Sequence, residues 1–270
     1  MIKILTLIVS VLFFSADIYA ANDLVQNWQF GFQEPASPLS KAIHETHNYI
    51  MIFVVLITLF VLLLLAYCCF KFRENKNPTP STTSHNTLLE IIWIAIPVVI
   101  VTLITIPSLK LIFFQEKIPE SEMTLKVIGR QWYWSYEYPD NGDIYFDSYM
   151  VKDEDLKEGE PRLLTTDNKV YLPTETYIKI QMTSSDVIHA FALPALGVKM
   201  DAVPGRLNET WVYIEKAGTY YGQCSELCGV LHAFMPIEVV ALPPEEFKKW
   251  VEEAKKEFAF NGNLKISSKL

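Results

Sequence analysis

Two long apolar runs constrain the fold of this chain more than any other feature. Tyr49–Phe70 spans twenty-two residues without a charge, and Ile91–Phe114 is of similar length with one charged residue, Lys110. A helix rises about 1.5 Å per residue, so the first run reaches roughly 33 Å, enough to cross the hydrocarbon core of a bilayer. We therefore expect two transmembrane helices. Pro97 and Pro107 are compatible with the second, because neighbouring helices can satisfy the freed carbonyl groups.

The N-terminal sequence MIKILTLIVSVLFFSADIYA has the pattern of a cleaved secretory signal. Lys3 gives a short basic start, Ile4–Phe14 is apolar, and Ala20 offers a small residue for cleavage. The apolar stretch of eleven residues is too short to be a membrane span of its own. These patterns predict a signal peptide at residues 1–20 and a transmembrane hairpin at residues 21–115.

The loop between the two apolar runs carries the basic residues Lys71, Arg73 and Lys76 close to the membrane. Because basic loops stay in the cytoplasm, both ends of the hairpin should face the opposite side, as a secretory signal also requires. The secretory-type signal favours the plasma membrane of a bacterium, with the C-terminal region in the periplasm, over the inner membrane of a mitochondrion.

The chain after the second apolar run has a different composition. Residues 1–114 carry equal numbers of acidic and basic side chains, so the whole net charge of −8 lies after residue 114. An acidic domain attracts basic partners rather than nucleic acid. Its short β-branched and aromatic runs, separated by Pro, Gly, Asn and Asp, predict an all-β sandwich or barrel at residues 116–242. The pattern PPEEFKKWVEEAKKEF predicts a helix, followed by a tail, at residues 243–270.

The stretch YGQCSELCGVLHAFMP holds Cys224, Cys228, His232 and Met235 within twelve residues. A disulfide is the simplest interpretation in an oxidising compartment, but it leaves the histidine and the methionine without a role. A zinc site could use two cysteines and two histidines, but it leaves the thioether unused.

Copper uses every one of these side chains. A blue-copper site takes two histidines, one cysteine and a weak axial methionine. His189 is the only other histidine after residue 85, so it is the candidate for the second imidazole. Cys224 is then an additional thiolate, and a pair of thiolates can bridge two copper ions. The residues therefore favour a dinuclear copper centre suited to fast electron transfer.

The sequence resembles the cytochrome c oxidase subunit 2 family, through the cysteine loop and through QWYWSYEY, KMDAVPGRLNET and IPSLK. The resemblance implies a cupredoxin-like copper domain behind the hairpin. It implies that Cys224 and Cys228 bridge both copper ions, that His189 and Met235 bind one of them, and that the second is bound by His232 and the backbone carbonyl of Glu226. The Glu226 carboxylate would also reach a magnesium ion shared with subunit 1.

The resemblance further implies that electrons from cytochrome c enter at Trp132. The alternation of QWYWSYEY predicts a strand with Trp132, Trp134, Tyr136 and Tyr138 on one face, where core packing is the competing role. Nearby acids form a candidate docking surface for a basic cytochrome c, although a merely solvated loop would have the same composition. These acids are Glu137, Asp140, Asp143 and Asp147.

Glu90 begins the second apolar run. Thr87-Leu88-Leu89-Glu90 fits a capping box, whereas in the family the acid at this position lines a proton path into subunit 1. Cys68 and Cys69 are interpreted as apolar packing within the membrane.

The predicted function is the electron-transfer subunit of a cytochrome c oxidase. It would pass electrons to haem a of subunit 1, which also holds the haem-copper centre, in a complex with a third subunit that couples oxygen reduction to proton pumping. A quinol oxidase subunit would lack the copper ligands. A membrane-tethered copper chaperone is the alternative from another class, and it would not need the aromatic run. A structural β-domain with one disulfide would leave His189, His232 and Met235 unexplained.

Overall fold

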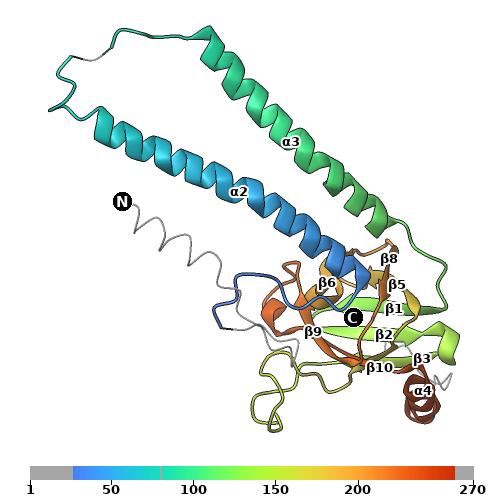
Figure 1. Ribbon diagram of the computed structural model, residues 1–270. Coiled ribbons are helices and arrows are strands. Elements are labelled where there is room, and N and C mark those ends of the chain that lie inside the picture. Colours follow the sequence, from blue (N-terminus) through green and yellow to red (C-terminus); the bar gives the residue numbers. More distant parts are fainter. Residues whose placement is uncertain (1–26, 80, 259–270) are drawn as a thin grey trace.

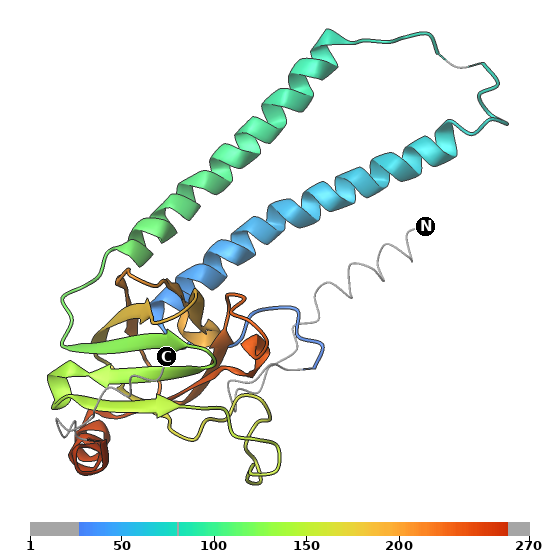
Figure 2. The same cartoon turned by 180° about the vertical axis from the view of Figure 1, so that it is seen from behind.

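The computed structural model describes residues 27–79 and 81–258 of the chain. Two helices, α2 (Pro38–Lys71) and α3 (Thr87–Glu116), extend together away from a domain built of strands, and a loop joins their far ends (Figures 1 and 2). The predicted signal peptide at residues 1–20 and the last twelve residues of the predicted tail lie outside the described residues.

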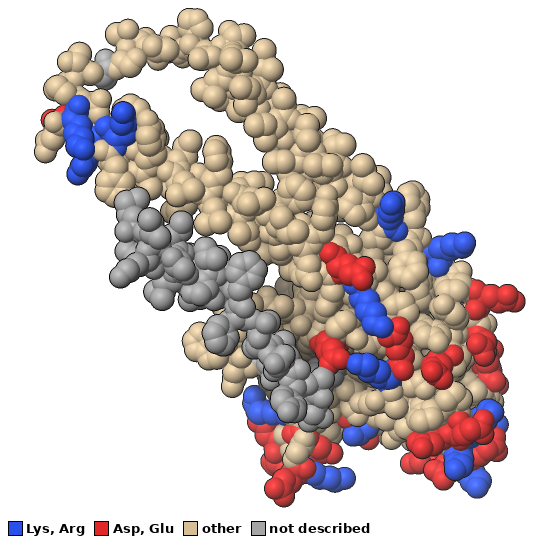
Figure 3. Space-filling model, in the orientation of Figure 1, with Lys and Arg blue, Asp and Glu red and all other residues tan. Residues whose placement is uncertain are grey.

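Both helices are long and apolar enough to cross a membrane. Helix α2 has 34 residues, or roughly 51 Å, so it extends well beyond a hydrocarbon core about 30 Å thick. It begins before the apolar run because Ser37 caps it, accepting a hydrogen bond from the Ser40 backbone N–H at 2.9 Å, and because Pro38 fits the first helical turn. Apart from the loop that joins them, the helices carry few charged groups, whereas acidic side chains gather over the domain (Figure 3).

The N-terminus of α3 differs from the predicted capping box by one residue. The cap is Asn86 rather than Thr87, because the Asn86 side chain accepts the backbone N–H of Leu89 at 3.1 Å. Glu90 reaches back to the Asn86 N–H at 3.4 Å, so it still serves the helix start. Pro97 and Pro107 lie inside the helix, as the sequence suggested.

The domain consists of two five-stranded sheets. The first has the order β3-β2-β1-β5-β8 and the second β4-β10-β9-β6-β7. The strands of the first sheet are β1 (Met123–Arg130), β2 (Tyr133–Tyr138), β3 (Ile144–Ser148), β5 (Tyr177–Ser184) and β8 (Asn208–Tyr213). Those of the second are β4 (Val170–Pro173), β6 (His189–Leu193), β7 (Val198–Ala202), β9 (Gly218–Cys224) and β10 (Pro236–Leu242). Short 3-10 turns lie at Pro139–Asn141, Pro194–Leu196 and His232–Phe234.

Alternate side chains of both sheets form one core. On β2 the buried hydrophobic residues are Trp134, Tyr136 and Tyr138, and on β5 they include Ile178 and Ile180. This period of two is what a sheet with one buried face requires. The prediction of a two-helix hairpin followed by an all-β sandwich is confirmed.

Helix α4 (Pro244–Phe258) lies along the edge of the sandwich farthest from the hairpin (Figure 1). Its buried residues Phe247, Val251 and Ala254 recur at helical spacing, as the amphipathic pattern predicts. Trp250 stacks on Tyr171 of β4, with ring centroids 4.8 Å apart. The helix therefore closes one end of the core.

The hairpin is attached to the domain at both helix ends. Before α2, the Ala36 N–H donates to the Ala195 carbonyl at 2.9 Å and the Ser37 hydroxyl donates to the Leu196 carbonyl at 2.7 Å. At the end of α3, the Trp211 indole of β8 donates to the Gln115 carbonyl at 3.0 Å. These contacts fix the position of the β-sandwich beside the membrane hairpin.

Candidate metal centre

The loop between β9 and β10 carries the cysteines. Cys224 is the last residue of β9, Cys228 lies in the loop, and Met235 comes directly before β10. The two strands pair antiparallel, and the Cys224 N–H donates to the Met235 carbonyl at 3.0 Å, which closes the base of the loop. The strand pairing therefore folds residues 225–234 back over their own ends and brings the candidate ligands together.

Four side chains of the predicted ligand set lie within short distances of one another. The two cysteine Sγ atoms are 3.8 Å apart and are not joined by a disulfide. Cys228 Sγ lies 3.6 Å from Nδ1 of His232, and Cys224 Sγ lies 3.9 Å from Nδ1 of His189. Each sulfur thus has its own imidazole, and the donor atoms of His189, Cys224 and Cys228 all lie within 4.8 Å of one another.

His189 reaches this loop from the first residue of β6 and is fully buried. Its ring packs against the edge of Trp134, with centroids 5.9 Å apart, and against the backbone of Gly129. A Cβ atom at Gly129 would lie only 2.8 Å from Cδ2 of His189. The absence of a side chain at residue 129 is therefore what allows the ring to occupy its place.

Met235 and Glu226 complete the predicted set in different ways. Met235 is buried, with 1 % of its surface exposed. The backbone carbonyl of Glu226 lies 3.4 Å from Cys224 Sγ, so it faces the cluster, while the residue itself is exposed. The set offers two soft thiols, two imidazoles, a thioether and a carbonyl, and this combination fits copper better than a hard cation.

The protonation of the two thiols is asymmetric. Burial acts to raise the pKa of Cys224, but hydrogen bonds with His189 and with the backbone near Glu226 and Ala190 bring that pKa below its ordinary value. Burial and the charge of the neighbouring Cys224 raise the pKa of Cys228. The pair therefore gives up its first proton easily and its second reluctantly, as two interacting acids do.

Two residues between β1 and β2 cover the loop. The Trp132 indole N–H and the Gln131 side-chain amide both donate to the Cys228 carbonyl, at 3.1 Å and 2.8 Å. Trp132 lies before β2, so the prediction that it alternates with Trp134 along one strand is wrong, and the residue is partly buried and packs against the core. The β1–β2 turn takes it out of the strand alternation and places it against the cysteine loop.

The four predicted docking acids lie on the β2–β3 hairpin, where three of them already have partners. Glu137 pairs with Lys126 at 2.5 Å, and Asp140 accepts the backbone N–H of Thr124 at 2.7 Å. Asp147 accepts from the hydroxyl groups of Ser135 and Tyr145, at 2.6 Å and 3.1 Å.

The fourth acid, Asp143, lies in the turn of this hairpin with a φ of 53°. The methylene carbons of Lys255 from α4 lie beside the neighbouring Gly142, while its ammonium group pairs with Glu252 at 2.8 Å.

Glu90 is remote from all of these residues. It lies at the far end of α3, and twenty-six residues of helix separate it from the end of that helix at the domain, a distance of roughly 40 Å. Glu90 is therefore too far away to contact the cysteine loop.

Sequence reasoning did not identify Asp186, Gln131 or Gly129 as part of the site. Asp186 Oδ1 lies 2.8 Å from Nε2 of His189. Burial acts to raise the pKa of Asp186, but hydrogen bonds from His189 and from the backbone N–H groups of Val187 and Gln131 hold that pKa below its usual value. The sequence feature that could have identified Asp186 is its position three residues before His189.

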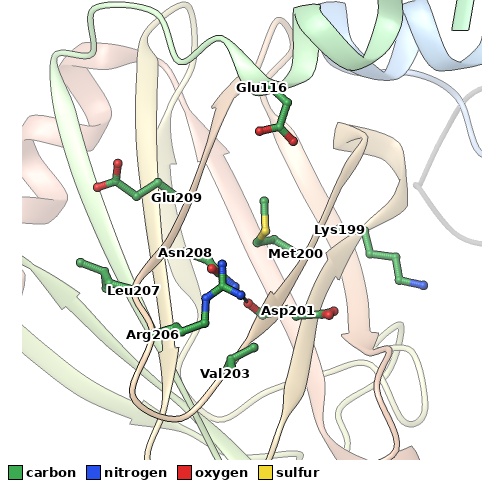
Figure 4. Close-up of a pocket in the computed structure, with 9 residues that line it drawn as sticks. All are labelled: Glu116, Lys199, Met200, Asp201, Val203, Arg206, Leu207, Asn208 and Glu209. Carbon is green, nitrogen blue, oxygen red and sulfur yellow. Dashed lines mark hydrogen bonds between the residues drawn. The ribbon is translucent and has the colours of Figure 1, made fainter. Parts of the chain in front are cut away.

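A separate cavity of about 710 Å³ lies near the end of α3 (Figure 4). Its wall carries charges of both signs, and the Asn208 side chain donates to the Asp201 carbonyl at 2.7 Å. No cysteine or histidine is among its lining residues, so its donor set is unlike that of the cysteine loop. The lining residues are Glu116, Lys199, Met200, Asp201, Val203, Arg206, Leu207, Asn208 and Glu209.

Comparison with known proteins covers both parts of the chain. Residues 123–242 match the family described as "Cytochrome C oxidase subunit II, periplasmic domain", and residues 25–111 match "Cytochrome C oxidase subunit II, transmembrane domain". The chain is 47% identical to a probable cytochrome c oxidase subunit 2 of Rickettsia bellii over 98% of both chains. It is 44% identical to cytochrome c oxidase subunit 2 of Phytophthora megasperma, over 90% of this chain and 92% of that one.

A solved structure resembles the β-sandwich. The periplasmic domain of subunit II of cytochrome oxidase from Bradyrhizobium japonicum is 57% identical, with a TM-score of 0.50. The match covers 53% of this chain and 100% of that one.

Proposed function

The chain belongs to the cytochrome c oxidase subunit 2 family, and we propose that it accepts electrons from cytochrome c at a dinuclear copper centre and delivers them to haem a of subunit 1. Family membership makes the chain an electron-transfer subunit of a haem-copper oxidase, a copper-binding membrane protein that works with other oxidase subunits. The number of copper ions, the donor protein and the remaining steps belong to the proposal.

The pairing of each sulfur with its own imidazole is the observation that carries the dinuclear proposal. Cys224 and His189 form one pair and Cys228 and His232 the other, with only 3.8 Å between the sulfur atoms. A single tetrahedral zinc ion would use these four groups and leave the buried Met235 without a role. Two copper ions would be held by Cys224 and Cys228 together with His189 and His232, and would also use Met235 and the Glu226 carbonyl as donors.

The fold holds the proposed ligands in place independently of electron transfer. The β9–β10 pairing holds the cysteines close together, and the sandwich buries His189 and Met235 away from water. A dinuclear copper centre supplies one-electron chemistry in which the added charge is shared by two ions. A rigid ligand set suits that chemistry because little has to move when the charge changes.

Trp132 is proposed as the place where electrons enter. Its ring is partly exposed, and its N–H is bonded to the carbonyl of a proposed ligand, Cys228. A donor that covers the ring would therefore have a short covalent and hydrogen-bonded route to the thiolate. The acids of the β2–β3 hairpin would attract a basic cytochrome c to this sheet and raise its association rate. Asp147, opposite Ser135, lies nearest Trp132, whereas Asp140 and Asp143 lie at the far end of β2.

The membrane part is proposed to place this domain in the bacterial periplasm, with subunits 1 and 3 as neighbours. The basic loop at Lys71–Lys76 supports a cytoplasmic location for the far end of the hairpin. There Glu90 would line the opening of a proton path, linked to proton pumping by the complex. The exposed Glu226 would share a magnesium ion with subunit 1 at the outer side.

Metal analysis of the purified full-length chain in detergent tests this proposal directly. The expected result is two copper ions per chain and a spectrum with hyperfine splitting from two copper nuclei. One copper ion or one zinc ion per chain would exclude the dinuclear centre.

A further inference from the structure

The Asp186 carboxylate connects two parts of the site that are far apart in the sequence. Its Oδ1 lies 2.8 Å from Nε2 of His189, and it also accepts the Val187 N–H at 2.6 Å and the Ser184 hydroxyl at 3.2 Å. Its Oδ2 accepts the backbone N–H of Gln131 at 2.7 Å. Both oxygen atoms are therefore occupied by donors, which an ionised carboxylate can accept without loss.

The contact with His189 decides which ring nitrogen carries the proton. An ionised carboxylate only accepts, so the Nε2 atom that faces it must be protonated. The neutral ring then has its lone pair on Nδ1, which faces Cys224 Sγ at 3.9 Å. Metal-binding histidines usually donate the other ring N–H to a carboxylate, a backbone carbonyl or water, which orients the ring in this way.

The contact with Gln131 extends the connection to the other half of the site. The same residue that donates its backbone N–H to Asp186 donates its side-chain amide to the Cys228 carbonyl at 2.8 Å. Gln131 is also directly bonded to Trp132 in the chain. Asp186, Gln131 and Cys228 therefore form a continuous polar link between the loop before His189 and the loop that carries the cysteines.

We propose that Asp186 is a positioning residue, which holds His189 in the Nε2–H tautomer and ties it through Gln131 to the Cys228 loop. The inference rests on the proposed function, because it treats His189 as a copper ligand. Asp186 would act in two separable ways. Its geometry fixes the ring and the Gln131 backbone, and its negative charge near the ligand favours the oxidised state of the centre.

Two substitutions separate these effects. In Asp186→Ala both acceptors are lost, so His189 should populate both neutral tautomers and the Gln131 N–H should lose protection from hydrogen exchange. In Asp186→Asn one oxygen remains, and the Val187 N–H and the His189 Nε2–H at the Oδ1 position should keep it there. The amide nitrogen would then face the Gln131 N–H, so this variant should keep the His189 tautomer, expose the Gln131 N–H and lack the charge.

The tautomer can be measured without metal, at an alkaline pH at which the His189 ring is neutral. The chain has five histidines, so nitrogen-15 labelling of histidine in the full-length chain in detergent gives a small set of ring signals. The signal of His189 is assigned by a His189→Gln variant. The expected result is protonated Nε2 in the parent and in Asp186→Asn, and mixed tautomers in Asp186→Ala.

The second measurement is the reduction potential of the copper-loaded full-length chain. Asp186→Asn should raise it, because a negative charge that favours oxidised copper has been removed. Glu253→Gln removes one exposed charge from α4 and is the matched control, which should leave the potential near that of the parent.

An unchanged potential in Asp186→Asn, an equal shift in Glu253→Gln, or a parent chain with the proton on Nδ1 would each overturn the proposal. If Asp186→Ala fails to fold, the potential and tautomer of Asp186→Asn still decide the matter. A parent chain that binds one metal ion yet shows the Nε2–H tautomer would contradict the dinuclear centre alone, because the tautomer is read without metal.

Discussion

The indole nitrogen of Trp132 lies 3.1 Å from the carbonyl oxygen of Cys228 and donates a hydrogen bond to it. One residue thus offers an aromatic surface to the outside and a polar contact to a proposed ligand on the inside. Packing alone does not require the N–H group, so the contribution of the hydrogen bond can be tested separately from that of the ring.

Trp132→Phe keeps an aromatic ring and removes the N–H donor. We expect slower electron transfer from reduced cytochrome c into the copper centre, with the salt dependence of association unchanged. The loss of one hydrogen bond should lower the free energy of unfolding by only about 1 kcal/mol. Stopped-flow kinetics on the assembled oxidase over a range of salt measures the rate of electron transfer and the salt dependence of association.

Tyr133→Phe is the control for this measurement. Tyr133 is the next residue and stacks on Tyr149 with ring centroids 4.4 Å apart, so the substitution keeps the ring contact and leaves Cys228 untouched. Should Trp132→Phe transfer electrons as fast as Tyr133→Phe, the Trp132–Cys228 contact has no part in the route.

The two sulfur-containing ligand types should respond differently to replacement. Cys224→Ser removes one of the two thiolates proposed to hold the copper ions, so the full-length chain should hold at most one copper ion. Met235→Leu removes only a weak axial ligand and should keep both ions while shifting the reduction potential. Metal analysis and potentiometry distinguish the two results, and equal loss of copper from both variants would contradict the proposed division of roles.

Gly129→Ala tests whether the space beside His189 is needed. The added Cβ would lie 2.8 Å from Cδ2 of the ring, so we expect a loss of stability of about 1–3 kcal/mol and weaker copper binding. Gly31→Ala is the control, since nothing lies within 4 Å of the Cβ position there. Denaturant unfolding and copper titration of both variants give the comparison, and a Gly129→Ala chain that binds copper like the parent would refute this packing argument.

The charge on the β2–β3 hairpin should set the association rate with a basic cytochrome c. Replacing Glu137, Asp140 and Asp143 together by their amides should lower that rate and flatten its salt dependence. Lys255→Gln should have the opposite effect, because this lysine lies beside the hairpin turn at Gly142.

Glu45→Gln, an exposed acid on α2, serves as the control for these charge changes. Stopped-flow mixing at several salt concentrations reports all of these rates. Equal rates in the acid and lysine variants would show that the donor docks elsewhere.

The sequence allowed the architecture and the proposed ligands to be predicted because both depend on local patterns. Uncharged apolar runs define the hairpin, and the spacing of Cys224, Cys228, His232 and Met235 fits one loop between neighbouring strands. Of the proposed ligands, only His189 lies far from this loop in the sequence, and it could be identified because the chain has few histidines.

What could not be predicted depends on contacts between distant segments. Trp132 was expected on the same strand face as Trp134, but a turn removes it from the alternation, and single-strand periodicity cannot show where a strand begins. Asp186 and Gly129 matter only because the fold brings the loops before His189 and before Trp132 together. The role of Glu137 as a partner of Lys126 likewise follows from the pairing of β1 with β2.

The attachment of the β-sandwich at both helix ends has a consequence for the distance that an electron must cross. A domain fastened only at Ala36 could swing about that point, but the second bond, from Trp211 to Gln115, removes this freedom. Tunnelling between two centres falls off steeply with their separation, so a swinging domain would deliver electrons at a fluctuating rate. With both ends fixed, the position of the proposed copper centre relative to the hairpin is set by the fold itself, so diffusion would matter only for the donor outside.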